Sequence, residues 1–211
     1  MAKKDKIVVE EKKVSKDEIE ANTKKAARDM FTEYGPFLIL LVFIIVIRVF
    51  IASPFKVQGT SMVPTLKNND YMLLYKLKKN VKGINRFDIV VVDSSQGAII
   101  KRVIGLPGEF IKYEVKEEDG VSKGILYVNG MVVDESFFLP NEYTSATCHR
   151  STDLCDEGIQ LKDDEYFVMG DNRAVSMDSR MLGTFSKKQI RGIADLRLFP
   201  FKSFGSVKAS K

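Results

Sequence analysis

Three segments of the chain carry residue types that suit nucleophilic chemistry, and the first contains Ser61. It lies in FKVQGTSMVPTL, residues 55–66, where Gly59, Thr60 and Pro64 favour an exposed loop between ordered elements. An exposed serine hydroxyl becomes a nucleophile when a neighbouring base accepts its proton. Most serines in such loops only complete a turn, so the other two segments decide whether Ser61 has a chemical role.

The second segment, AIIKRVIGLPGE, contains a candidate base, Lys101. Strand alternation places Ile99, Lys101 and Val103 on one face, beside apolar neighbours. Burial disfavours the charged ammonium group, and a neutral amine is a competent general base. To be mostly neutral near pH 7, the pKa of this amine must fall by about 3 units. A surface lysine on an edge strand is the alternative.

The third segment, GDNRAVSMDSRMLG, follows the apolar strand pattern YFVM and begins with a turn-forming Gly-Asp-Asn sequence. Its spaced charges could hold a loop together through charge-assisted hydrogen bonds. These charges belong to Asp171, Arg173, Asp178 and Arg180. A salt-bridged surface loop would explain the charges but would leave Ser176 without a role.

These segments follow a single long apolar run, residues 37–52, which is interrupted only by Arg48. As a helix this run would extend about 24 Å, slightly less than a bilayer core. Aromatic residues at its rims and a snorkelling Arg48 make a tilted span acceptable. A buried core helix is the alternative, but the run has no polar face. We therefore predict a transmembrane anchor over residues 36–54.

The charges that flank the apolar run predict its orientation. Lys24, Lys25 and Arg28 precede the run, whereas only Lys56 follows it closely. The positive-inside rule then places residues 1–35 in the cytoplasm as a charged tail and the later residues outside the cell membrane. A cleaved export signal is the alternative. It is disfavoured because the preceding region is long and Pro54 follows the one small-residue site.

The remainder, residues 55–211, is predicted to be a mostly β extracytoplasmic domain. Short apolar segments rich in β-branched and aromatic residues have the length of strands. They are residues 71–77, 87–92, 98–104, 125–128, 131–133, 166–169 and 193–199. The Asn129-Gly130 pair between two of them predicts a hairpin turn. The segment at about 112–164 differs in composition from its neighbours, which indicates a small inserted subdomain.

Composition limits the partners that the chain can have. The 211 residues carry a net charge of +5 and a pI near 9.0, but no stretch is basic enough to bind nucleic acid. Cys148 and Cys155 would form a disulfide in an oxidising compartment and would be free thiols in the cytosol. A metal site that also used His149 lacks a fourth ligand at the usual spacing, so no metal is expected.

Taken together, these segments resemble the bacterial type I signal peptidases. GTSMVPTL is similar to the family's nucleophile segment, NNDYMLLYK to the adjoining strand, KRVIGLPGE to the general-base segment and GDNRAVSMDSRMLG to the last conserved segment. The single anchor and small insertion resemble the Gram-positive form. The resemblance covers nearly all of residues 37–205 and implies a signal-peptidase-like β fold, with a small inserted β subdomain, after one transmembrane helix.

The resemblance also implies residue roles. Ser61 would attack the scissile carbonyl, Lys101 would accept its proton, and Ser176 would orient the lysine amine. The N–H of Ser61 would bind the oxyanion. Gly59 stands where one branch of the family has a serine, so the second donor would be another backbone N–H, a water or a substrate group. Other residues would support the site, namely Gly59, Arg102, Asp171, Arg173, Asp178 and Arg180.

The implied substrates are the signal peptides of exported preproteins, cut after small residues in Ala-x-Ala style. An extended segment would pair with the edge strand at residues 55–58 and with residues near 99–100. The pocket residues would be Phe55, Val57, Gln58, Met62, Leu66, Ile99 and Ile100; core packing is the alternative for the apolar ones.

The anchor would hold the domain beside membrane lipid and near the export translocon. No cofactor is expected. Two alternatives are a self-cleaving SOS-repressor peptidase, which would have a DNA-binding domain and no anchor, and a non-catalytic signal-peptidase-like factor for surface fibre assembly, which would lack Ser61 or Lys101.

Overall fold

The computed structural model describes residues 16–118, 120–136, 138–140 and 154–207. The chain divides into two compact units, Met1–Val46 and Ile47–Lys211. Each unit is described separately below. Cys148 and His149 lie outside the described residues, so the disulfide to Cys155 stays a prediction.

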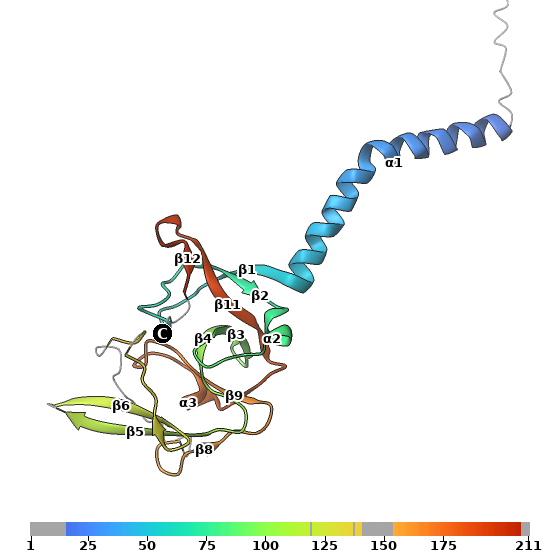
Figure 1. Cartoon of the computed structure of the whole chain (residues 1–211). Coiled ribbons are helices and arrows are strands. Elements are labelled where there is room, and N and C mark those ends of the chain that lie inside the picture. The colour runs from blue at the N-terminus through green and yellow to red at the C-terminus, as the bar shows by residue number, and fades with distance from the viewer. Residues whose placement is uncertain (1–15, 119, 137, 141–153, 208–211) are drawn as a thin grey trace, which may run out of the picture. The chain divides into compact units, whose positions relative to one another are not determined.

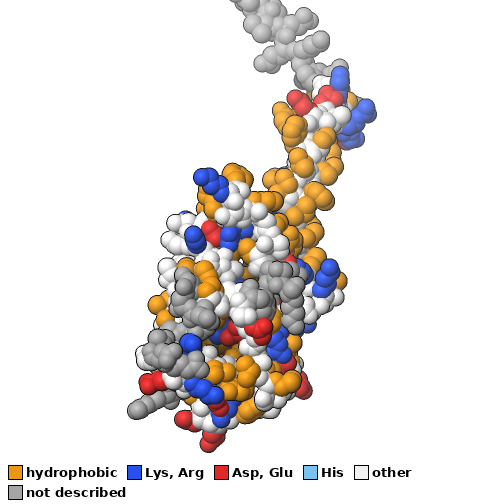
Figure 2. All heavy atoms as spheres, turned by 60° about the vertical axis from the view of Figure 1, so that its left-hand side comes forward, with side chains coloured by type: hydrophobic (Ala, Val, Ile, Leu, Met, Phe, Trp, Pro, Cys, Tyr) orange, Lys and Arg blue, Asp and Glu red, His pale blue; other side chains and the backbone are white. Residues whose placement is uncertain are grey.

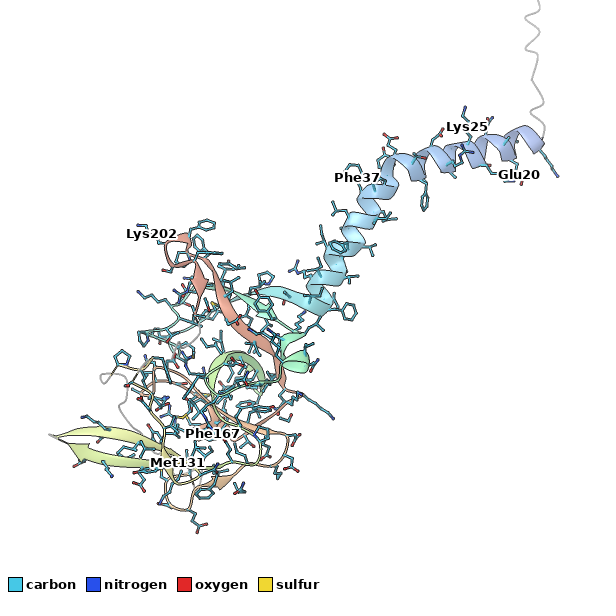
Figure 3. The ribbon with its side chains drawn as sticks, viewed as in Figure 1. Glu20, Lys25, Phe37, Met131, Phe167 and Lys202 are labelled. Atoms are coloured by element: carbon cyan, nitrogen blue, oxygen red, sulfur yellow. The ribbon has the colours of Figure 1, made fainter. Side chains whose placement is uncertain are left out.

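The first unit is dominated by the long helix α1, Lys16–Val46. Pro36 lies inside it, and the helix bends where Phe37 is labelled (Figure 3). Proline lacks the N–H that an α-helix needs and its ring crowds the preceding turn, which accounts for the bend. Hydrophobic side chains cover the visible face of the helix in Figure 2, and its large hydrophobic residues from Phe37 to Val46 are solvent-exposed. The helical stretch Ile19–Ile51 has a mean hydropathy of 2.6 over its most apolar window and is long enough to cross a membrane.

The second unit begins with a turn of π-helix, η1 (Ile47–Ile51), and then the strand β1 (Ala52–Lys56). The helical conformation therefore ends three residues before the end of the anchor expected from the sequence. Pro54 explains the change, because the residue before a proline is disfavoured in the α conformation. β1 pairs in an antiparallel manner with β2 (Tyr71–Tyr75).

The main sheet is antiparallel and has the strand order β1-β2-β11-β3-β4-β9-β10, with β12 paired to β11 (Figure 1). The strands not yet given are β3 (Ile89–Ser94), β4 (Gly97–Gly105), β9 (Glu165–Met169), β10 (Phe185–Ser186), β11 (Ile190–Phe199) and β12 (Gly205–Ser206). Three short helices connect parts of the chain: α2 (Lys78–Val81), α3 (Ser179–Leu182) and the 3-10 helix η3 (Phe201–Ser203).

Among the open strand edges of the main sheet, within the described residues, are β1 and the first half of β4. β1 pairs only with β2, which makes it a sheet edge. β4 pairs with β3 from Gly97 to Arg102, but its pairing with β9 begins only at Arg102. The first half of β4 therefore presents unpaired backbone N–H and C=O groups, which can bind another extended segment.

A second antiparallel sheet, with the order β7-β6-β5-β8, lies in the segment for which the sequence predicts an inserted subdomain. Its strands are β5 (Phe110–Glu118), β6 (Val121–Val128), β7 (Met131–Val132) and β8 (Ile159–Gln160). The Asn129-Gly130 turn joins β6 to β7, and both turn residues have positive φ. β5 was not among the strands predicted, because its charged residues hide the alternation of Ile111, Tyr113 and Val115. The prediction of a mostly β fold after an apolar N-terminal helix is confirmed.

Candidate active site

The loop that carries Ser61 is held closed by backbone hydrogen bonds at its base. The N–H of Val57 donates to the carbonyl of Asp70 at 2.8 Å, and the N–H of Asn69 donates to the carbonyl of Val57 at 2.9 Å. Gly59 has a φ of +85°, a conformation that favours glycine, and its N–H donates to Oδ1 of Asn68 at 3.0 Å. These bonds fix the backbone on both sides of the serine.

Lys101 lies in β4 with its side chain directed at this loop. Its Nζ is 2.7 Å from Oγ of Ser61 and 3.0 Å from the carbonyl of Ile100. Only 3% of Lys101 is exposed. The structure thus places the amine inside the protein and in hydrogen-bond contact with the hydroxyl, a distance suited to proton transfer.

Burial lowers the pKa of Lys101 from 10.5 to about 8, while the charges of Asp178 and Asp171 oppose this shift and that of Arg180 adds to it. The pKa falls by less than the 3 units that a mostly neutral amine at pH 7 requires. With a pKa of about 8, only about one amine in ten is neutral at pH 7. The two carboxylates therefore oppose the effect of burial on this amine.

Ser176 is buried beside the backbone of Ser61, and its hydroxyl interacts with the carboxylate of Asp178, whose pKa it helps to lower. Gly170 shows how tightly this region is packed. A Cβ at position 170 would lie 2.1 Å from Oγ of Ser176 and 2.4 Å from the carbonyl oxygen of Ser61. That carbonyl also accepts a 3.0 Å hydrogen bond from the N–H of Asn172.

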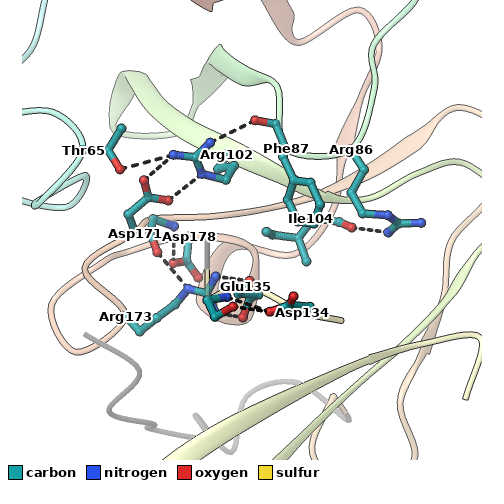
Figure 4. A network of polar contacts seen from close by, with 12 residues as sticks. Thr65, Arg86, Phe87, Arg102, Ile104, Asp134, Glu135, Asp171, Arg173 and Asp178 are labelled. Atoms are coloured by element: carbon teal, nitrogen blue, oxygen red, sulfur yellow. Dashed lines mark hydrogen bonds and ion pairs between the residues drawn. The ribbon is translucent and has the colours of Figure 1, made fainter. Parts of the chain in front are cut away.

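A buried ion pair fixes the segments beside the lysine (Figure 4). Nε and Nη2 of Arg102 donate to the two carboxylate oxygens of Asp171 at 2.8 and 2.6 Å, and neither side chain is exposed. Arg102 also donates to the carbonyl of Phe87 at 3.0 Å and to Oγ1 of Thr65 at 3.3 Å. This two-bond pairing joins β4 to the start of the loop at 170–183.

The rest of that loop is held by a second charged cluster. The carboxylate of Asp178 accepts hydrogen bonds from Nε and Nη2 of Arg180 at 2.9 and 3.0 Å and from the N–H of Gly170 at 3.0 Å. Burial acts to raise the pKa of Asp178, but Arg180 and the Gly170 N–H hold it below its ordinary value. Nε of Arg173 donates to the carbonyl of Gly170 at 3.0 Å, which closes the loop on itself.

A cleft of about 430 Å³ opens beside the serine and lysine. It is lined by the predicted residues Phe55, Gln58, Ser61, Ile99, Ile100 and Lys101, together with Lys56, Gln96, Gly97 and Ala98. Val57, Met62 and Leu66 were also predicted to line a pocket. They are not part of this lining and lie in a buried apolar cluster with Met72 and Ile89, against which Phe55 packs.

Several residues at the site carried no signal in the sequence. Glu135, from the inserted subdomain, accepts a 2.8 Å hydrogen bond from Nη1 of Arg173 and a second from Nη2. The ring of Phe138 lies 4.2 Å from the guanidinium of Arg102. Thr65 and Asn172 stood within the quoted segments, but nothing in their spacing distinguished them. Glu135 and Phe138 could not be identified because their partners are distant in the chain.

Comparison with known proteins gives consistent matches. A family model described as "Signal peptidase, peptidase S26" matches residues 30–199. "Signal peptidase I S" from Bacillus subtilis (strain 168) is 39% identical over 78% of this chain and 86% of its own length. "Signal peptidase I" from Bacillus amyloliquefaciens is 36% identical over 92% of this chain and 100% of its own length. A third relative, from Bacillus caldolyticus, is 36% identical over 80% of this chain and 91% of its own.

Proposed function

The chain belongs to the signal peptidase family, peptidase S26, and from this membership we propose that it is a serine endopeptidase that removes signal peptides from exported preproteins. The observation that carries the proposal is the 2.7 Å separation of Lys101 Nζ and Ser61 Oγ inside the protein. Cleavage of an Ala-x-Ala signal-peptide substrate by the wild-type chain and by Ser61→Ala and Lys101→Ala variants tests it. A non-catalytic role in fibre assembly has no support, since both residues are present and in contact.

In the proposed mechanism Ser61 Oγ attacks the scissile carbonyl carbon. Lys101 Nζ, in its neutral form, accepts the hydroxyl proton and then gives it to the leaving amine. Water deacylates the enzyme with the same lysine as base. The lowered pKa of Lys101 supports this role, because burial makes the neutral form accessible at moderately alkaline pH. A bound substrate that removes further water from the cleft would lower this pKa again.

Two further groups complete the proposed site. The N–H of Ser61 donates no hydrogen bond within the described residues, so it is available to bind the oxyanion. Gly59 offers no side chain, and the second donor is another backbone N–H, a water or a group of the substrate. Ser176 orients the lysine amine. Two observations support this role: the Ser176 hydroxyl is buried beside the Ser61 backbone, and it interacts with Asp178, whose charge acts on the Lys101 amine.

The cleft supports recognition of an extended peptide. β1 offers an open edge on one side and residues 97–101 of β4 offer another, so a substrate strand gains main-chain hydrogen bonds from the domain. Phe55, Ile99 and Ile100 supply apolar lining next to Ser61. The buried Val57, Met62 and Leu66 pack beneath this lining, which limits the pocket depth and favours small side chains before the cut.

The apolar helix anchors the enzyme in the membrane, and its flanking charges favour a single pass with the N-terminus cytoplasmic and the catalytic domain outside. A tethered domain meets the signal peptide at raised effective concentration, near the export translocon. Exposed Phe199, Phe201 and Phe204 form an apolar tip in the second unit. This tip contacts membrane lipid in the proposed arrangement.

A further inference from the structure

Arg173 is a buried cation whose carboxylate partner comes from outside the motif that contains it. The Arg173 side chain is 1% exposed and that of Glu135 is 11% exposed. Both terminal nitrogens of Arg173 donate to the two Glu135 oxygens, one of them at 2.8 Å. A buried guanidinium without such a partner strongly destabilises the folded protein. Glu135 therefore determines where the Arg173 side chain can lie.

From Arg173, which Figure 4 shows beside Glu135, contacts lead towards both Ser61 and Lys101. Nε of Arg173 holds the Gly170 carbonyl at 3.0 Å, and Nη2 of Arg180 holds the Arg173 carbonyl at 2.7 Å. Gly170 packs directly against the Ser61 carbonyl. Arg180 orients Asp178, whose charge acts on the Lys101 amine. A shift of Arg173 would thus move the surroundings of the nucleophile and of the base together.

The same turn of the inserted subdomain reaches the second arginine. The Glu135 carbonyl accepts hydrogen bonds from the N–H groups of Phe138 and Leu139 at 3.1 and 2.8 Å, which fixes the turn. The Phe138 ring then lies 4.2 Å from the guanidinium of Arg102, the residue after Lys101. One turn therefore contacts both arginines that frame the dyad.

On this geometry we infer that Glu135 is a positioning residue for the reaction, through which the inserted subdomain holds the 170–180 loop against Ser61 and Lys101. The inference rests on the proposed function. It assigns the insertion a part in catalysis, although none of the described residues of the insertion lines the cleft.

The test compares Glu135→Gln with a matched variant, Glu109→Gln, in the full-length chain with a signal-peptide substrate. Glu109 also pairs with an arginine, Arg86, and accepts the N–H of Leu106, but none of these bonds reaches residues 170–180. Glu135→Gln is expected to lower kcat about 10- to 100-fold, because displacements near 1 Å have such effects. KM is expected to change less than about twofold, since the cleft lining is untouched.

Glu109→Gln is expected to lower the thermal unfolding temperature while leaving kcat within about twofold of wild type. If both variants lose kcat equally, the effect is general destabilisation and the inference is overturned. Glu135→Asp keeps the charge but shortens the side chain by one methylene. This variant replaces Glu135→Gln in the test if Glu135→Gln does not fold. Its kcat is expected to be reduced, and a wild-type kcat would overturn the inference.

The wild-type chain separates the two levels of the proposal. An active wild type with an unaffected Glu135→Gln variant would overturn only the role of Glu135. A folded wild type that does not cleave would overturn the proposed function and this inference with it.

Discussion

Lys101 Nζ and Ser61 Oγ lie 2.7 Å apart although the two residues are 40 positions apart in the chain. Strand β4 presents the amine, and a loop closed by Val57, Asn69 and Asp70 presents the hydroxyl. Because the amine is also buried, the pair combines contact with a lowered pKa, the two properties that a Ser-Lys dyad requires.

Removal of either dyad residue should abolish cleavage. Ser61→Ala and Lys101→Ala are each expected to reduce kcat by roughly 1,000-fold or more, since nucleophile and base act as a unit. Lys188→Ala, at an exposed lysine, serves as the control and should keep wild-type turnover. Wild-type turnover in either dyad variant would contradict the proposed mechanism.

Cleavage should depend on pH through the state of one amine. The pKa of Lys101 is lowered to about 8, and only the neutral amine accepts a proton. We therefore expect kcat/KM to rise about tenfold per pH unit below this pKa and to level off above it. A pH profile between about 6 and 10 measures the midpoint. A flat profile across this range would exclude Lys101 as the base.

The buried amine should also reduce stability. The pKa of Lys101 in the folded protein, about 8, is below its ordinary value of 10.5, so the unfolded chain binds more protons between these two values. Stability then rises with pH across this window. Lys101→Met should increase the free energy of unfolding by up to roughly 3 kcal/mol at pH 7, and this difference should shrink towards pH 10.5. Denaturant unfolding of both proteins at the two pH values measures this difference. An equal free energy of unfolding for wild type and Lys101→Met at pH 7 would contradict the prediction.

Gly170→Ala should disturb both serines. The new Cβ would lie 2.1 Å from Ser176 Oγ and 2.4 Å from the Ser61 carbonyl oxygen. The backbone oxygen cannot move cheaply, so we expect a loss of about 1–3 kcal/mol in unfolding free energy and reduced kcat. Gly35→Ala is the control, because its nearest neighbour is Phe31 Cδ1 at an ordinary 3.6 Å. Unchanged activity in Gly170→Ala would show that the loop can adapt.

Lipid contact at the apolar tip can be tested with a single fluorescent residue, because the chain contains no tryptophan. Phe201 is 79% exposed at this tip, and Met131 is 71% exposed in the inserted subdomain. In vesicles that contain brominated phospholipid, we expect the fluorescence of a Phe201→Trp variant to be quenched. The fluorescence of Met131→Trp should be unaffected. Equal quenching at both positions, or none at Phe201→Trp, would contradict the proposed lipid contact.

Much of the fold was predictable because it depends on local patterns. The apolar run predicted a helix that could cross a membrane, the strand-length segments predicted β structure, and Asn129-Gly130 marked the hairpin. β5 escaped prediction because its charged positions dilute the alternation. The helix ends at Ile51, before the expected end of the anchor, because Pro54 disfavours helix and residues 52–54 pair with β2 as a strand.

The residue types and their order in the sequence determined the chemistry that this protein could perform: a serine in a tight loop, a lysine in an apolar strand and a charged loop. Alternation along a strand says which face Lys101 occupies, but it cannot say what lies opposite. Only the tertiary structure shows that the amine contacts Ser61, that Glu135 pairs with Arg173 and that Phe138 packs on Arg102. Only the tertiary structure shows that Val57, Met62 and Leu66 are buried in the core. Tertiary structure also limited the fall in the pKa of Lys101, because burial and the charges of Asp171 and Asp178 act in opposite directions and depend on distances set by packing.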